Sequence, residues 1–222
     1  MRGTAKTYVA LIGDLVASRG LEDRAAAQAS VLAALSSANA EWADALAARF
    51  VVTLGDEFQG LLLTAEHAFD VVATLERGLG GVRARYGIGV GELATPLRQD
   101  AIGMDGPCFH RAREAVERGK RDDRWVTVAG FGGARDELMN GLFRIMGGVR
   151  RSWTEVQAET VFVVRELGEQ KAAAAARGVS EATVSKALKA ALYEPFTEAE
   201  RTVKKLLSGA IEATRRDAGG RV

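Results

Sequence analysis

Apolar segments that alternate between strand-like and helix-like spacing over the first 131 residues constrain the fold of this chain more than any other feature. The run Thr7–Val16 is apolar and rich in β-branched residues, and Gly13-Asp14 interrupts it near its end, which is typical of a buried strand. Phe50–Leu63 has two apolar runs around Leu54-Gly55-Asp56-Glu57 and predicts a β-hairpin with the acidic pair at its turn. Residues 82–93, whose glycines indicate close backbone approach, and residues 124–131 predict two further strands.

Helical spacing fills the intervals between these strands. Residues 21–48 place apolar side chains at helical intervals, Thr64 is positioned to cap a second helix, and Pro107 suits the first turn of a third. The resulting order β-α-β-β-α-β predicts a ferredoxin-like sandwich with an antiparallel sheet.

The strand-like patterns stop after about Arg135. Five apolar residues then recur at helical spacing, and Trp153–Leu167 predicts another amphipathic helix. The five are Leu138, Leu142, Ile145, Met146 and Val149. We therefore expect an α+β protein with a sheet-containing domain at residues 1–134, a helical connector at 135–153 and an all-α domain at 154–222.

Composition excludes several kinds of site. One cysteine, Cys108, allows no internal disulfide and no cysteine-rich zinc site, and two histidines, His67 and His110, give poor support to a Ser-His-Asp hydrolase. No run is long and apolar enough for a membrane span and no secretory signal is recognisable, so we expect a cytoplasmic protein. Residues 141–222 hold 14 basic and 10 acidic residues, against 16 and 19 in residues 1–140, so the C-terminal part is the better partner for a polyanion.

Asp14 and Asp56 are the candidate metal ligands. In a β-α-β-β-α-β sheet the first strand and the hairpin lie side by side, so these two carboxylates can meet although they are far apart in sequence. Two neighbouring carboxylates repel each other unless a divalent cation lies between them, and magnesium would link them to nucleotide phosphates. Because Gly-Asp is also common turn chemistry, turn capping is the alternative interpretation.

Four motifs occur in an order that resembles the SatD family: GDLVASR, LGDEFQGLL, RYGIGVGE and IGMDGPCFHRARE. The N-terminal part of that family is similar to the catalytic palm of class III nucleotide cyclases and, more distantly, of GGDEF diguanylate cyclases. The resemblance covers most of residues 7–120. It implies a nucleotide cyclase-like palm domain that uses magnesium, a homodimer, and an association with stress responses.

The resemblance also implies roles for individual residues. Asp14 and Asp56 would be the two metal carboxylates, with the backbone carbonyl of Leu15 beside the first. Arg113 would be the catalytic arginine that stabilises the transition state. The further ligand-binding candidates are Gly55, Glu57 and Gly103.

Three positions depart from the cyclase pattern. Val52 stands in place of the purine-reading lysine, Phe109 in place of an asparagine before the arginine, and Leu54 in place of the first glycine of GGDEF. These losses favour a site that binds metal and phosphate but has lost or changed its cyclase chemistry. On the same helix, Arg111, Arg113, Arg118, Lys120 and Arg121 would contact phosphates if they face the site, although a solvated face is the plainer expectation for residues 118–121. His110 is expected to be exposed or satisfied rather than a metal ligand.

Residues 169–191 predict a helix-turn-helix. Ala174 is small where two helices would cross, Gly178 suits a left-handed turn, and Val184 and Leu188 would hold the second helix against the first. Ser180 is expected to cap the second helix.

The second helix of this motif would face the major groove of DNA. Its candidate DNA-binding residues are Ser180, Glu181, Ala182, Ser185, Lys186 and Lys189. Four basic residues alongside, Arg177, Arg201, Lys204 and Lys205, would contact phosphates. A protein-docking or dimerisation module remains an alternative, since the positive charge of this part is modest.

Two functions of different classes are consistent with these features. The first is a DNA-binding regulator whose cyclase-like domain binds a nucleotide or phosphorylated ligand with a divalent metal. The alternative is an active magnesium-dependent nucleotidyl cyclase or nucleotidyltransferase that uses Asp14, Asp56 and Arg113. A structural partner protein with a vestigial palm is a third.

Overall fold

The computed structural model describes residues 6–16, 24–53 and 55–219. The chain divides into two compact units, one of residues 1–143 and 203–222 and the other of residues 144–202. None of the helices in the described part of the chain is both long enough and apolar enough to cross a bilayer.

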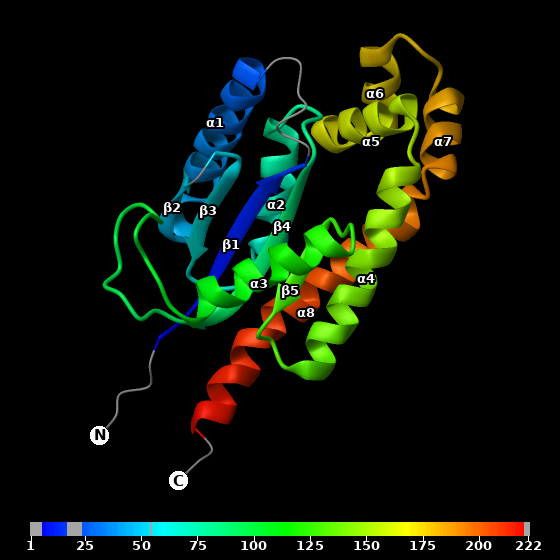
Figure 1. Cartoon of the computed structure of the whole chain (residues 1–222). Helices are drawn as coiled ribbons and strands as arrows, with labels where there is room; N and C mark the ends of the chain where they lie inside the picture. The colour runs from blue at the N-terminus through cyan, green and yellow to red at the C-terminus, as the bar shows by residue number, and fades with distance from the viewer. Residues whose placement is uncertain (1–5, 17–23, 54, 220–222) are drawn as a thin grey trace. The chain divides into compact units, whose positions relative to one another are not determined.

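The first unit is built on a five-stranded sheet. Its strands are β1 (Thr7–Leu15), β2 (Leu46–Val52), β3 (Glu57–Leu62), β4 (Ala84–Glu92) and β5 (Val126–Ala129). They lie in the order β2-β3-β1-β4-β5, and all neighbours are antiparallel except β4 and β5. With α1 (Arg24–Glu41), α2 (Ala68–Gly78) and α3 (Pro107–Arg121), the expected β-α-β-β-α-β order is present, followed by β5 as a parallel edge strand (Figure 1).

Helix α3 covers one face of this sheet. Tyr8, Ala10 and Ile12 alternate along β1 and pack in one cluster with Phe109, Ala112 and Val116 of α3. A Cβ on Gly89 of β4 would lie 2.2 Å from the backbone nitrogen of Ala112, and a Cβ on Gly87 or Gly91 would lie 2.1 or 2.8 Å from the backbone of α3. The β4 glycines predicted to allow close approach therefore set the distance between α3 and the sheet, and with it the position of every polar side chain on α3.

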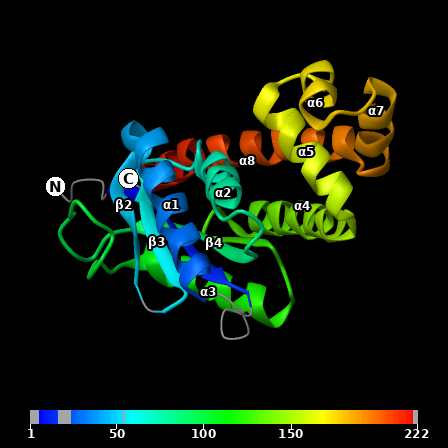
Figure 2. The same cartoon turned by 90° about the horizontal axis from the view of Figure 1, so that it is seen from above.

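The opposite face of the sheet carries α1 and α2, as Figure 2 shows. These two helices are in contact, since a Cβ on Gly78 of α2 would lie 2.6 Å from the Cα of Ala34 in α1. The Asn39 side chain ties α1 to β2 by hydrogen bonds with both the backbone N–H and the carbonyl of Phe50, at 2.7 and 3.0 Å. Both faces of β1 are thus covered, which explains its continuous apolar run.

Two helix boundaries and one helix face differ from the sequence-based expectation. The first helix ends at Glu41 rather than reaching residue 48, because a 3-10 turn at Ala43–Ala45 leads directly into β2 at Leu46. The second helix begins at Ala68 with His67 as its N-cap, so Thr64 does not cap it. In α4 (Gly133–Ser152), the expected inward residues Leu138 and Ile145 are exposed, whereas Met139, Phe143 and the expected Met146 are buried.

The second unit is helical. It contains α5 (Glu155–Leu167), α6 (Gln170–Arg177), α7 (Glu181–Ala190), the C-terminal part of α4 and the N-terminal part of α8 (Tyr193–Gly219). Val161 and Val164 of α5 pack with Ala174 of α6 and with Val184 and Leu188 of α7. The Trp153 indole donates a hydrogen bond of 2.8 Å to the carbonyl of Ala191, which fixes the end of this small core.

Candidate functional site

Charged side chains gather on the α3 face of the sheet where β1 ends. Asp14 of β1 is paired in register with Glu57 of β3 on one side and with Arg85 of β4 on the other. Since side chains alternate between faces, Asp14 lies on the same face as Ile12, which is the face that α3 covers. The sheet therefore presents three charged residues side by side beneath the C-terminal half of α3.

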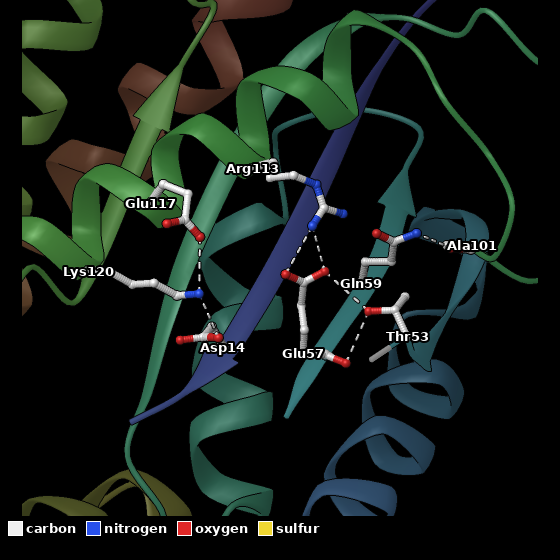
Figure 3. Close-up of polar contacts among 8 residues, drawn as sticks. All are labelled: Asp14, Thr53, Glu57, Gln59, Ala101, Arg113, Glu117 and Lys120. Carbon is white, nitrogen blue, oxygen red and sulfur yellow. Dashed lines mark hydrogen bonds and ion pairs between the residues drawn. The ribbon is translucent and has the colours of Figure 1, made fainter. Parts of the chain in front are cut away.

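Two residues of α3 form ion pairs with these strand carboxylates (Figure 3). Lys120 Nζ lies 3.0 Å from Asp14 Oδ1 and 3.1 Å from Glu117 Oε1. Arg113 donates from one guanidinium nitrogen to both carboxylate oxygens of Glu57, at 3.0 and 3.1 Å. We refer below to the Asp14 cluster, which consists of Asp14, Asp56, Glu57, Arg113, Glu117 and Lys120.

The three α3 members of the cluster stand at positions i, i+4 and i+7, so they share one side of the helix. The neighbouring side of α3 carries Phe109, Ala112 and Val116, which are buried against the sheet. The apolar contact therefore fixes the rotation of α3, and that rotation aims the three charged side chains at the ends of β1 and β3.

Asp56 is brought to the cluster by the β2–β3 turn. Thr53 N–H donates to the Glu57 carbonyl at 2.9 Å, which closes the turn, and Gly55 adopts a φ of 60°. The backbone N–H of Leu15 donates to the carbonyl of Asp56 at 3.1 Å, so the turn is attached to the end of β1. The expected hairpin with its acidic pair at the turn is present.

Burial and neighbouring charge act in opposite directions on Asp14. Its side chain is only 9% exposed, and this burial raises the pKa of Asp14, an effect that Lys120 opposes and that the charges of Asp56 and Glu57 reinforce. Lys120 is more exposed, and although burial opposes its charge, its hydrogen bonds to Asp14 and Glu117 leave its pKa raised. The ammonium group of Lys120 thus offsets only part of the effect that burial and the neighbouring carboxylates have on the pKa of Asp14.

Gln59 adds a buried acceptor beside the cluster. It follows Glu57 on the same face of β3, is 5% exposed, and donates from Nε2 to the carbonyl of Ala101 in the loop before α3. Within the described part of the chain its Oε1 atom has no hydrogen-bond partner. Figure 3 shows this oxygen on the side of Arg113, opposite Ala101. A buried acceptor without a donor costs about 1–3 kcal/mol, so it points to a donor that is supplied by a ligand or water.

The donor chemistry of the cluster fits a hard divalent cation only in part. Carboxylate oxygens of Asp14 and Asp56 are suitable ligands, but among the described residues no group of three His, Cys, Asp or Glu side chains is arranged to hold a metal. Magnesium commonly takes one or two protein carboxylates and completes its shell with water and phosphate oxygens. The residues present therefore fit a cation that arrives with a phosphorylated ligand and do not fit a cation enclosed by protein alone.

The remaining predicted site residues lie at different places in the structure. Leu15 and Gly55 lie at the attached ends of β1 and the turn, as described above. Gly103 lies in the loop before α3 with a φ of 64°, and its described neighbour is Arg98 rather than a member of the cluster. Phe109 is buried in the apolar contact with the sheet, and Leu54 lies outside the described residues.

Sequence reasoning did not single out Glu117 and Gln59, and it did not predict that Lys120 pairs with Asp14. Lys120 is exposed, as expected for a solvated helix face, and it also faces the cluster. The available signal was spacing: Lys120 stands seven residues after Arg113, on the same side of one helix. His110, by contrast, is exposed and pairs with Asp105 at 2.7 Å, as expected for an exposed or satisfied side chain.

The second unit contains the predicted pair of short helices. Helix α6 ends at Gly178, whose φ is 64°, and Ser180 caps α7 by accepting a hydrogen bond from the N–H of Thr183. Val184 and Leu188 are buried, as expected. The outward residues of this segment are all exposed: Ser180, Glu181, Ala182, Ser185, Lys186 and Lys189.

Two of the four basic residues that were expected to contact DNA phosphates beside α7 form ion pairs with carboxylates of this chain. Arg177 has a side chain only 11% exposed, donates to Thr160 at 2.6 Å and pairs with Glu159 at 2.8 Å, so it holds α6 to α5. Lys204 forms an ion pair with Asp70 of α2. Arg201 and Lys205 are exposed.

A family comparison matches most of the chain, and solved structures match about half of it. The model of the SatD family matches residues 8–207. No curated protein matches. Among solved structures, a bacterial light-regulated adenylyl cyclase is similar with a TM-score of 0.43 and 10% identity, over 58% of this chain and 44% of that one.

Two further solved structures show the same low level of similarity. A second structure of a bacterial light-regulated adenylyl cyclase has a TM-score of 0.42 and 10% identity over 57% of this chain and 77% of that one. The guanylate cyclase domain of RhGC from Catenaria anguillulae, in complex with GTP, has a TM-score of 0.37 and 13% identity over 50% of this chain and 72% of that one. Similarities of this size do not bear on what this chain binds.

Proposed function

Because this chain belongs to the SatD family, with a match over residues 8–207, we propose one function for both of its units. The sheet-containing unit binds a nucleotide or another phosphorylated ligand together with a divalent cation at the Asp14 cluster. The helical unit binds DNA through α7. The protein is thus a ligand-responsive DNA-binding regulator.

The observation that carries the ligand-binding proposal is the composition of the Asp14 cluster. The carboxylate of Asp14 is buried beside those of Glu57 and Asp56, and Lys120 pairs with it. Burial, and then the charges of Asp56 and Glu57, raise the pKa of Asp14, and a divalent cation bound there would oppose both effects. The unpartnered acceptor of Gln59 next to it independently supports a ligand.

Each side chain then has a role in binding. A bound divalent cation would supply positive charge to the phosphate oxygens of the ligand. Asp14 and Asp56 would ligate that cation through carboxylate oxygens. Lys120 and Arg113, which pair with strand carboxylates in the structure, would then turn toward phosphate oxygens, which accept charge-assisted hydrogen bonds equally well. Gln59 would accept a hydrogen bond from an N–H or O–H of the ligand.

Binding is better supported than cyclase chemistry. The position at which cyclases are expected to have an asparagine is Phe109, and its side chain is 3% exposed in the core between α3 and the sheet. It has no polar atom and no access to a ligand. Arg113 is half exposed and held by Glu57. The active nucleotidyl cyclase or nucleotidyltransferase therefore remains the second candidate, and the same experiment detects it.

A thermal-shift and calorimetric titration tests ligand binding. The full chain is titrated with ATP, GTP and inorganic triphosphate, each with and without Mg²⁺, and the mixtures are analysed by chromatography. The proposal requires that at least one phosphorylated compound raises the melting temperature more with Mg²⁺ than without it. Asp14→Asn should abolish the magnesium-dependent part, whereas Asp44→Asn, a substitution of a carboxylate in the 3-10 turn at Ala43–Ala45, should leave it unchanged. No stabilisation by any compound contradicts the proposal, and a new nucleotide product favours the enzyme.

DNA binding rests on the surface of α7. Lys186 and Lys189 are exposed on the same side as Ser185 and Ala182, and Val184 and Leu188 anchor the opposite side in the core of the unit. A capped, exposed, basic helix supported by two others is the form in which a major groove is read. The exposed Arg201, which belongs to the same unit, would add a phosphate contact.

Fluorescence polarisation with genomic DNA fragments over a range of salt tests this part. Wild type should bind with an affinity that falls as salt rises, and Lys186→Ala with Lys189→Ala should weaken binding and reduce the salt slope by about two. Lys171→Ala, which removes an exposed charge from α6, is the matched control and should have the smaller effect. Absence of binding to any duplex at low salt would leave α6 and α7 as a protein-docking module.

A further inference from the structure

Lys120 occupies a position that a divalent cation would need. Its Nζ atom is 3.0 Å from Asp14 Oδ1, which is hydrogen-bonding distance, and Asp14 is the most buried carboxylate of the cluster. The ammonium group is held from the other side by Glu117 at 3.1 Å. Because the two charges repel each other, an ammonium nitrogen on Asp14 Oδ1 weakens the binding of a metal ion to the same carboxylate.

We infer that Lys120 acts as a built-in competitor for the divalent cation at Asp14. In the free protein the ammonium group pairs with Asp14 and lowers the affinity of this carboxylate for a free cation. The inference rests on the function proposed above, and it concerns the regulation of the same site: which species can enter it, and in what combination.

The placement of Lys120 on α3 allows its ammonium group to leave Asp14 and pair with another acceptor nearby. Its side chain is 35% exposed, whereas that of Asp14 is 9% exposed, so the ammonium group can leave toward solvent while the carboxylate stays in place. The backbone of α3 is fixed by its contact with Gly87 and Gly89 of β4, so only the side chain needs to move. A released Lys120 would remain within reach of anything bound over Asp14.

This arrangement selects for a cation that brings phosphate with it. A free cation must displace Lys120 from Asp14 and leaves the ammonium beside a new positive charge. A cation that carries a phosphate group provides a new acceptor for the displaced ammonium, so the charge of Lys120 is again balanced. Lys120 therefore couples cation binding to phosphate binding, which excludes abundant free cations from the site.

Titration of the full chain with Mn²⁺ alone, followed by electron paramagnetic resonance of the free ion, tests this inference without any ligand or activity. Lys120→Met should bind Mn²⁺ about tenfold more tightly than wild type, a change typical of the loss of one partly buried ion pair. Lys120→Arg, which keeps the charge, should behave as wild type. Arg121→Met removes an exposed positive charge from the next residue of the same helix. It controls for the effect of a lower net charge on Mn²⁺ binding, so the Mn²⁺ affinity of this variant should stay near that of wild type.

The outcomes separate this inference from the proposed function. Asp14→Asn combined with Lys120→Met should lose the gain, because the carboxylate for which the two cations compete is gone. Equal or weaker Mn²⁺ binding by a folded Lys120→Met, with wild type still showing magnesium-dependent ligand binding, would overturn the competitor role and leave the proposed function intact. No Mn²⁺ binding by wild type and all variants, even with inorganic triphosphate, would overturn both.

Discussion

Replacement of Gly89 by alanine provides the sharpest structural prediction, because it alters the distance that positions the Asp14 cluster. A Cβ at this position would lie 2.2 Å from the backbone nitrogen of Ala112 and 2.3 Å from the carbonyl oxygen of Cys108. Both atoms belong to the backbone of α3, so no side-chain rotation relieves the contact. Helix and sheet would have to separate by roughly 1 Å to restore ordinary van der Waals distances.

The expected cost follows from this displacement. Overpacking a well-packed core typically costs about 1–3 kcal/mol, and the rigid backbone neighbours place Gly89→Ala near the upper end. The lower backbone entropy of alanine in the unfolded chain offsets about 0.5–1 kcal/mol of that. We therefore expect the free energy of unfolding to fall by about 2 kcal/mol, measured by urea denaturation with an unchanged m-value.

A matched glycine serves as the control. Gly141 lies in α4 with nothing within 4 Å of an added Cβ, so Gly141→Ala should stabilise the protein by about 0.5–1 kcal/mol. Because Arg113 and Lys120 move with α3, Gly89→Ala should also weaken ligand binding at the Asp14 cluster. An unfolding free energy for Gly89→Ala within 0.5 kcal/mol of wild type would refute the close contact between α3 and β4.

Three further predictions test individual residues. Burial raises the pKa of Asp14, so its contribution to stability is present at low pH and is lost as pH rises through that pKa. Asp14→Asn should therefore be more stable than wild type at pH 7, with the difference shrinking toward pH 4 in urea denaturation; lower stability at pH 7 would contradict this. Burial also raises the pKa of Cys108 to about 11, so iodoacetamide should not label the native thiol at pH 8 but should label it in urea, as mass spectrometry would show. Gly178→Ala should destabilise the protein by about 1 kcal/mol because of its φ of 64°, with Gly178→Asn less affected; equal effects of the two substitutions would argue against a backbone cause.

The hydrophobic pattern of the sequence predicted the strands, but the expectation of an antiparallel sheet was wrong for β5, which pairs with β4 in parallel. Thr7–Leu15 is buried on both faces and reads as a continuous apolar strand, and the hairpin around Asp56 follows from two short runs with a turn between them. Helix limits were less predictable. The spacing of apolar residues continues from α1 into β2, so the pattern does not reveal that the helix ends at Glu41.

The sequence singled out Asp14, Asp56, Glu57 and Arg113 of the candidate site, but not Glu117 or the pairing of Lys120 with Asp14. Asp14 and Asp56 belong to recognisable strand and turn motifs, and their convergence follows from strand order alone. The partners Lys120 and Glu117 depend on the rotation of α3, which is set by glycines in β4 and by Ala112 and Val116. The rotation of α3 is set by three-dimensional packing. It cannot be predicted from a run of charged residues near the end of a helix.

The location of a bound cation tests the account most directly. Crystals grown with MnCl₂ and the phosphorylated compound that stabilises the protein most should be measured at a wavelength where manganese scatters anomalously. The account predicts an anomalous peak about 2.2 Å from carboxylate oxygens of both Asp14 and Asp56, with Lys120 turned toward a phosphate oxygen. Phosphate density without such a peak, and with Lys120 still paired to Asp14, would contradict it.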